Sequence, residues 1–322
     1  MLSGIARRRE YGLLGLLVLT AAGVQFVNRG FLSAANLRDM LVQCAPAVIV
    51  ACGMTLVIVM GEIDISVGSM MGALAAVLGI LTSTQRMGLP VGVGIVITLA
   101  LGSLLGLFNG VLVTYGKVPS MIVTLGMLTV LRGFTEILMG GEWITGLPPG
   151  LRLIGTGSAA GIPFSLMIAA AVVVGSVIFT RNTCIGRRIY AVGGNPEAAR
   201  LAGLRVRRLK ILVFTLTGFL TAVATLLTTT QLSVIESGMG IGFELLVVTC
   251  VMVGGASITG GIGTILGSVL GAILLGMVRT ELIFLKLGAA STYWERAIQG
   301  AFILLAVIAD HLARRRRDGQ TR

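Results

Sequence analysis

The chain has 322 residues, of which 55% are hydrophobic and only 12% are charged, and its formal net charge is +12. Soluble globular domains carry about 25% charged residues, so this composition excludes an ordinary soluble domain and indicates a protein that lies mainly in lipid. The positive charge would suit nucleic acid. Most basic residues lie where membrane topology would place them, however, so we expect no nucleic-acid partner.

Apolar runs recur along the whole chain, and each is close to the roughly 20 residues needed to cross about 30 Å of hydrocarbon. We predict an all-α polytopic membrane protein with about ten transmembrane helices (8–10) in a single domain (1–322). Several runs contain Gly-rich breaks and are candidates for broken or re-entrant segments. The expected spans are 12–28, 41–60, 65–83, 90–114, 119–139, 163–180, 211–231, 243–259, 262–283 and 296–312.

The first span follows three arginines and is longer than the apolar part of a signal peptide, which favours an uncleaved anchor. With the N-terminus in the cytoplasm, segments 1–10, 115–118, 181–210 and 312–322 fall on the cytoplasmic side and hold 17 of the 25 Lys and Arg residues. This is the positive-inside bias. An even number of spans returns the basic tail (312–322) to the same side, where its charges also attract anionic membrane lipid.

Two acidic residues, Glu62 and Asp64, interrupt apolar sequence at the end of the second expected span. Charges within lipid are costly and normally face a cavity, the bundle interior or water. One hypothesis is a proton or ion relay. The other, which we favour, is a cytoplasmic turn close to water, where Asp64 with Ser66 would cap the next helix.

Further polar groups lie at membrane depth. Asn109 and Thr124 could contact a polyhydroxylated solute or hold helices together, and for either one alone we expect helix packing. Arg132 and Glu136 lie four residues apart on one helical face and are expected to neutralise each other, although cation before anion is the weaker orientation. The candidate translocation path consists of Asp64, Ser66, Asn109, Thr124 and Glu136.

The loop 140–162 contains one basic residue and is expected on the outer side. Trp143 suits the membrane–water interface, where aromatic rings with a polar edge are enriched. The loop is therefore an interfacial anchor and turn or, alternatively, an external rim that a delivery partner contacts.

The basic loop 181–210 contains a short helix signal. Asn195 is an N-cap candidate, Pro196 suits the first helical position, Glu197 suits the positive end of the helix dipole, and Gly203 provides a stop. A helix of about two turns is not stable alone, so it must rest on its own bundle or dock as a coupling helix in a groove of a cytosolic partner. The candidate coupling residues are Asn195, Pro196, Glu197, Ala198, Ala199, Arg200 and Gly203.

Two segments, 61–68 and 254–261, resemble each other, because each lies in apolar sequence and is bounded by glycines seven residues apart. Gly-interrupted apolar segments at corresponding places in two halves are the best sequence pointer to the working region of a transporter. The alternative is that Gly-rich helix packing recurs by chance.

The sequence has no G-x-x-x-x-G-K-[ST] loop for binding phosphates. It contains a single histidine, His311, and four isolated cysteines, so we expect no metal site, no disulfide framework and no bound cofactor. An enzyme is not expected. The energy for any transport must come from an ion gradient or from a partner.

The motifs together are similar to those of the permease subunits of bacterial ABC importers for sugars, of the ribose, rhamnose and autoinducer-2 type. The resemblance covers nearly the whole chain, and the stretch 140–148 looks most like the rhamnose and autoinducer-2 branch. Glu62 departs from the family, which usually has Gly there, and so does 236–239. The motifs are GEIDISVGS (61–69), FNG (108–110), VPSMIVTLG (118–126), GRRIYAVGGN (186–195) and VGGASITGG (253–261).

This resemblance implies a permease in the bacterial plasma membrane that imports a sugar or sugar-like solute. It implies a second permease subunit (homodimer or heterodimer), a cytosolic ABC ATPase that binds ATP and Mg²⁺, and a periplasmic sugar-binding protein. In that picture the helix at 195–203 docks on the ATPase and transmits its closure to the pore. Two other hypotheses remain: an ion-coupled secondary transporter of a small polar solute, using Glu62, Asp64 or Glu136, and a membrane scaffold that moves no solute.

Overall fold

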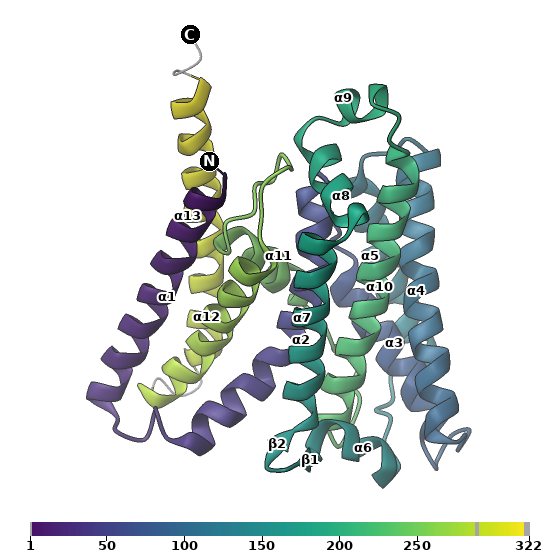
Figure 1. Ribbon diagram of the computed structural model, residues 1–322. Coiled ribbons are helices and arrows are strands. Elements are labelled where there is room, and N and C mark those ends of the chain that lie inside the picture. Colours follow the sequence, from purple (N-terminus) through teal and green to yellow (C-terminus); the bar gives the residue numbers. More distant parts are fainter. Residues whose placement is uncertain (1, 287–289, 319–322) are drawn as a thin grey trace.

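The computed structural model describes residues 2–286 and 290–318, and nearly all of its regular structure is helical (Figure 1). In chain order the elements are α1 (Leu2–Val27), α2 (Ala34–Val59), α3 (Val67–Thr82), α4 (Val91–Tyr115), α5 (Ser120–Met139), α6 (Pro149–Thr156), β1 (Ser158–Ala159), β2 (Ile162–Pro163), α7 (Phe164–Asn182), α8 (Cys184–Gly194), α9 (Pro196–Leu201), α10 (Val206–Gln231), α11 (Phe243–Val253), α12 (Ile265–Phe284) and α13 (Ser291–Asp318). The two short strands form an antiparallel hairpin in which Ser158 faces Pro163.

Seven helices in the described part of the chain are long and apolar enough to cross a membrane, namely α1, α2, α4, α5, α7, α10 and α12. Two further apolar helices, α3 and α11, are shorter. The all-α polytopic class is thus confirmed, whereas the number of about ten spans is not. The expected span 243–259 is wrong in its second half, because α11 ends at Val253 and a Gly-rich turn follows.

The centre of the bundle is α2, which contacts α7, α10, α11 and α12. From residue 44 onward its residues are almost entirely apolar and all of them are buried, as expected for a helix surrounded by other helices. The turn 60–66, after α2, and the Gly-rich turn 254–264, after α11, lie outside regular helices.

The most extensive helix–helix contact in the described part of the chain is that of α4 with α10. Gly102, Gly106 and Gly110 recur every fourth residue along α4, and a Cβ on Gly106 would meet the carbonyl oxygen of Phe214 in α10. From the opposite side, a Cβ on Gly218 would meet the carbonyl oxygen of Gly102. Small residues at this spacing let two backbones approach closely in a membrane, where packing rather than the hydrophobic effect holds helices together.

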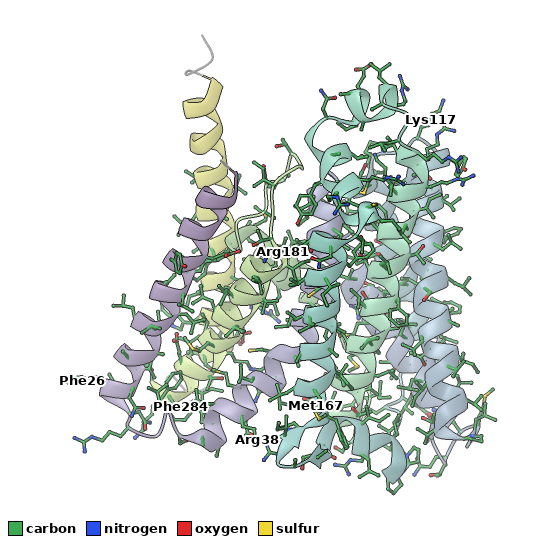
Figure 2. The ribbon with its side chains drawn as sticks, in the orientation of Figure 1. Phe26, Arg38, Lys117, Met167, Arg181 and Phe284 are labelled. Atoms are coloured by element: carbon green, nitrogen blue, oxygen red, sulfur yellow. The ribbon has the colours of Figure 1, made fainter. Side chains whose placement is uncertain are left out.

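The bundle has two ends. Helices α8 and α9 lie at one end, hereafter the α9 end, together with the start of α1 and the close of α13, and α6 with the β-hairpin lies at the other, the α6 end (Figure 1). Lys117 projects at the α9 end, whereas Arg38 and Met167 lie at the α6 end (Figure 2). The basic loop 181–210 and the end of α13 thus share one end, as the charge pattern predicts. The last four residues of the expected basic tail, 319–322, lie outside the described residues.

Candidate functional site

The predicted short helix forms, with the predicted ends. Asn195 adopts an extended backbone, and its side-chain oxygen accepts hydrogen bonds from the backbone N–H of Glu197 (3.1 Å) and of Ala198 (3.0 Å). Gly203 has a left-handed backbone (φ 81°), and its N–H donates to the carbonyl oxygen of Arg200 at 3.0 Å. The N-cap and the glycine stop are therefore confirmed.

Helix α9 contacts its own bundle along one side only. Ala199 is buried, whereas Glu197 and Arg200 are exposed, and the apolar side chain of Leu201 is 82% exposed. The helix rests on the bundle through a single small side chain. Its other faces are open to water and free to contact another molecule.

The preceding helix, α8, is joined to the bundle through backbone contacts between glycines. Gly193 lies so close to the carbonyl oxygen of Val59 that a Cβ would overlap it, and the N–H of Gly261 donates to that same oxygen at 2.8 Å. Gly260 packs on the backbones of Gly61 and Gly193. We call these five residues, Val59, Gly61, Gly193, Gly260 and Gly261, the glycine junction. It joins the end of α2, the end of α8 and the turn 254–264.

A second contact fastens α8 to the same turn. The hydroxyl group of Tyr190 donates a hydrogen bond to the carbonyl oxygen of Gly263 at 2.9 Å. Burial raises the pKa of Tyr190 to about 12, although the charge of Arg181 acts in the opposite direction. The hydroxyl group therefore stays a neutral donor near neutral pH, and this contact between α8 and the turn 254–264 does not titrate there.

The two similar Gly-rich segments, 61–68 and 254–261, meet at the glycine junction. Gly61 has a positive φ of 75°, and a Cβ on it would come within 3.5 Å of the carbonyl oxygen of Thr259. The start of the first segment is thus in contact with the end of the second. Gly193 of α8 contacts the end of the second segment and Val59, which comes two residues before the first.

Four of the five candidate path residues lie together near this point. Oδ1 of Asp64 accepts hydrogen bonds from the N–H (2.9 Å) and the hydroxyl group (2.6 Å) of Ser66. The amide group of Asn109 donates to the hydroxyl oxygen of Ser66 at 2.9 Å, and the hydroxyl group of Thr124 donates to the carbonyl oxygen of Ile63 at 3.3 Å. The expected packing role of Asn109 and Thr124 is confirmed. The expected cap is wrong, because Ser66 is the N-cap residue of α3 but no side chain caps the helix, and Asp64 accepts only from Ser66, before the first helical residue.

The fifth path residue, Glu136, is separate: it lies on an exposed face of α5. The expected pair with Arg132 is wrong, because no such ion pair exists among the described residues. The guanidinium group of Arg132 instead donates to the carbonyl oxygens of Ser237 and Met239, each at 3.0 Å. The partners of Arg132 are therefore two backbone carbonyl groups on the inner side of α5, and not the carboxylate of Glu136 on its outer side.

We expected Glu62 and Asp64 to lie at a turn close to water, and only Glu62 fits this expectation. Glu62 lies at the turn between α2 and α3 and forms an ion pair with Lys210 of α10. Asp64 is fully buried, so its expected contact with water is wrong. The hydrogen bonds from Ser66 satisfy one carboxylate oxygen there in place of water.

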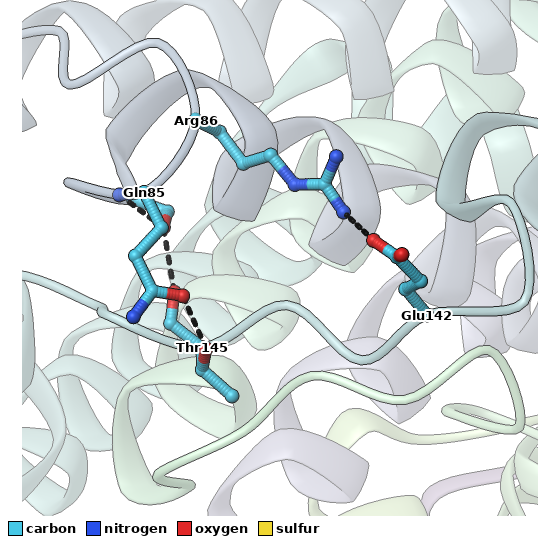
Figure 3. A network of polar contacts seen from close by, with 5 residues as sticks. Gln85, Arg86, Glu142 and Thr145 are labelled. Carbon is cyan, nitrogen blue, oxygen red and sulfur yellow. Dashed lines mark hydrogen bonds and ion pairs between the residues drawn. The ribbon is translucent and has the colours of Figure 1, made fainter.

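At the α6 end, the loop after α5 is held by polar contacts (Figure 3). Arg86 forms an ion pair with Glu142 at 2.7 Å, and the hydroxyl group of Thr145 donates to Gln85 at 2.6 Å. Trp143 is 67% exposed between these contacts. The loop is thus fixed on both sides of an aromatic ring that stays accessible.

Sequence reasoning missed the glycine junction, the hydrogen bond of Tyr190 and the partners of Arg132. One signal was present for the junction: the chain has glycine doublets at 193–194 and 260–261. A doublet within a helix or turn is a mark of close backbone approach. Nothing in the sequence says which doublet meets which.

Comparison with known proteins identifies similar permeases along most of the chain. The family model described as "Branched-chain amino acid transport system / permease component" matches residues 36–307. The chain is 37% identical to the ribose import permease protein of Haemophilus influenzae over 299 residues, which are 92% of this chain and 91% of that protein. It is 36% identical to the ribose import permease protein of Escherichia coli K12 over 306 residues, 94% and 93% of the two chains.

A third relative, the autoinducer 2 import system permease protein of Escherichia coli (strain K12 / DH10B), is 34% identical over 310 residues, which are 96% of this chain and 89% of that protein. No solved structure matches the chain. The resemblance to ribose-type and autoinducer-2-type import permeases is therefore confirmed over most of the chain.

Proposed function

The chain belongs to the permease-component family that its residues 36–307 match, and on that premise we propose that it is the transmembrane subunit of an ATP-driven ABC importer. It moves a sugar or sugar-like solute inward, and a separate ATPase supplies the energy. The names of the relatives, ribose import and autoinducer 2 import permeases, support the solute class. They are named as permeases, which supports a transport rather than an enzymatic role for this chain.

One observation carries the mechanical part of the proposal. The exposed helix α9 follows α8, and α8 is joined at the glycine junction to the end of α2 and to the turn 254–264. Backbone-to-backbone contacts contain no flexible side chain that could adjust to a displacement. A displacement of α9 and α8 would therefore also displace the end of α2 and the turn 254–264. A soluble ATPase that grips α9 would thereby move the central helix of the bundle.

The distribution of charge supports the orientation. Basic residues of the loop 181–210 and Lys117 lie at the α9 end, which the positive-inside rule assigns to the cytoplasm. Both termini are then cytoplasmic and the protein lies in the bacterial plasma membrane. The α6 end faces the periplasm, where the rim with Trp143 receives an exported sugar-binding protein. A second permease subunit completes the pore.

Reconstitution tests the proposal. The reading frames beside this one should encode an ABC ATPase and an exported sugar-binding protein. The purified chain is placed in proteoliposomes with both proteins, and the uptake of radiolabelled ribose and of autoinducer-2 is measured. We expect uptake that requires all the components together with ATP, and that an uncoupler leaves unchanged.

Uptake that an imposed ion gradient drives without ATP would contradict the proposal and favour an ion-coupled secondary transporter. If the chain copurifies with other proteins whether or not a solute is present, and no sugar is taken up, a membrane scaffold would be favoured. The ATPase-docking role is tested separately with Glu197→Lys, which places the wrong charge at the positive end of α9. We expect this variant to insert normally and to lose both uptake and copurification of the ATPase.

The control is Glu142→Lys, an equal change of charge on an exposed residue at the opposite end of the bundle. It should keep the ATPase bound. If Glu197→Lys binds the ATPase and transports as well as the wild type, α9 is not the coupling helix, although the importer assignment would stand on the reconstitution.

A further inference from the structure

A cavity of about 690 Å³ opens at the α9 end between α8, the turn after α9 and the start of α10. Three arginines line it, Arg188 from α8, Arg205 from the turn and Arg208 from α10. Ile185, Leu209 and Leu212 supply an apolar wall. The cavity therefore combines a strongly basic part with a hydrocarbon part.

Among the described residues, the three arginines have no acidic partner. No Asp or Glu lines the cavity, and none of the three takes part in an ion pair among the residues that the structure describes. Each guanidinium group presents several N–H donors in a planar fork that matches phosphate oxygens. Three like charges around one space repel one another until an anion enters it.

The apolar wall of the cavity indicates which kind of anion fits it. Leu212 belongs to α10, which begins at Val206 and is long and apolar enough to span the membrane, so the cavity lies where that helix enters the lipid. A free inorganic anion would gain nothing from Ile185, Leu209 and Leu212. A molecule with a phosphate group on a hydrocarbon stem would use both parts of the cavity.

A second basic cavity nearby differs in this respect. It is about 410 Å³ in volume, on the other side of α10, and is lined by Lys117, Arg207 and Lys210 but also by Glu62. Glu62 already pairs with Lys210, and Arg207 lies over the ring of Tyr115 at 5.6 Å. Its cations are largely engaged, so the unpaired arginines set the first cavity apart.

We propose that the cavity of Arg188, Arg205 and Arg208 binds the headgroup of an anionic phospholipid. The phosphate group lies on the guanidinium groups, and the glycerol and upper acyl carbons lie on Ile185 and Leu212. Basic pockets at the cytoplasmic membrane surface are suited to such headgroups. Because Gly203, which ends α9, also lines the cavity, the bound lipid supports the base of the exposed helix.

The test measures lipid binding to the full chain alone, with no ATP, solute or partner, so its result does not depend on the proposed transport function. The chain is purified in detergent and titrated with phosphatidylglycerol or phosphatidylcholine, and bound lipid is counted by native mass spectrometry. We expect one phosphatidylglycerol to be retained in clear preference to phosphatidylcholine. The double variant R188Q/R208Q should weaken that binding about tenfold, because two charge-assisted hydrogen-bonding groups are lost.

The control is R207Q, which removes one arginine charge at the position next to Arg208 in α10 but faces the other cavity. It should stay within about twofold of the wild type, since surface charge alone contributes little. A charge-retaining double variant, R188K/R208K, should bind with intermediate affinity because lysine lacks the planar fork. It provides the same test if R188Q/R208Q does not fold.

Three outcomes overturn the proposal. Equal retention of phosphatidylglycerol by the wild type and both double variants shows that lipid does not use these arginines. Displacement of the lipid by excess inorganic phosphate shows a free-anion site. Unchanged lipid binding by R188Q/R208Q, with loss of ATPase copurification by the same variant in a separate assay, assigns the cavity to a protein interface.

Discussion

Gly193 lies directly against the carbonyl oxygen of Val59, the last residue of α2, with no room between them for a Cβ. The next residue, Gly194, also belongs to α8, but nothing lies within 4 Å of where its Cβ would be. Two adjacent glycines in one helix therefore have opposite environments. This difference makes the glycine junction testable with very small changes.

We expect Gly193→Ala to reduce ATP-driven uptake into proteoliposomes sharply while the chain still inserts. The added methyl group must displace the end of α2 from α8, and overpacking of this kind costs about 1–3 kcal/mol. Uptake is measured at equal amounts of inserted protein, and the thermal midpoint of the purified variant is recorded beside it.

The control is Gly194→Ala, which adds the same methyl group to open space and should transport like the wild type. A Gly193→Ala variant with full uptake, or equal loss in both variants, would contradict a role for the junction in transmission.

The short helix α9 could be predicted almost completely because its determinants are local. Asn195, Pro196 and Gly203 act on backbone groups within three residues of themselves, so their effect can be read without knowledge of the fold. The spans could be predicted for the same reason, since a long apolar run needs no partner to be recognised. The helix boundaries failed where glycines end a helix early, as after Val253.

The glycine junction and the partners of Arg132 could not be predicted, because they depend on which distant segments meet. Arg132 and Glu136 satisfy the spacing rule for a helical pair, but one points inward and the other outward. The inner acceptors for Arg132 are carbonyl oxygens more than a hundred residues away. Every residue type carries a backbone carbonyl group, so the sequence does not indicate which residues act as these acceptors.

Glu62 and Lys210 form a half-buried ion pair between the turn after α2 and the start of α10. We expect each of Glu62→Gln and Lys210→Met alone to destabilise the protein, because each leaves one partly buried charge without its partner. The double variant should lose less than the sum of the two, which a double-mutant cycle of thermal midpoints in detergent would reveal.

The charge-swapped variant, Glu62→Lys with Lys210→Glu, should recover part of the loss. Strict additivity of the single effects would show that the two side chains do not interact in solution.

Gly218 is the tightest point of the contact between α10 and α4, where its Cβ would meet the carbonyl oxygen of Gly102. We expect Gly218→Ala to lower the thermal midpoint of the detergent-purified chain and the yield of inserted protein, because the two helices must separate to admit the methyl group. Gly126→Ala is the matched control, since Gly126 also lies within a membrane-spanning helix but has open space around it. Equal stability of the two variants would contradict the close approach.

Asp64 provides the sharpest test between a structural and a proton-carrying carboxylate. One of its oxygens accepts two hydrogen bonds from Ser66, and an asparagine side chain offers a carbonyl oxygen in the same position. Its second oxygen has no hydrogen-bond partner among the described residues, so the amide group of an asparagine would break no bond there. We therefore expect Asp64→Asn to keep most of the ATP-driven uptake.

Asp64→Ala should lose most of that uptake, because it leaves the buried N–H of Ser66 without an acceptor, a loss of about 1–3 kcal/mol. Uptake of both variants is measured with and without an uncoupler at equal amounts of inserted protein. If Asp64→Asn abolishes uptake as completely as Asp64→Ala, the hydrogen bonds to Ser66 are not what the site requires. Asparagine preserves the shape and the acceptor but cannot bind and release a proton, so that result would restore the relay hypothesis.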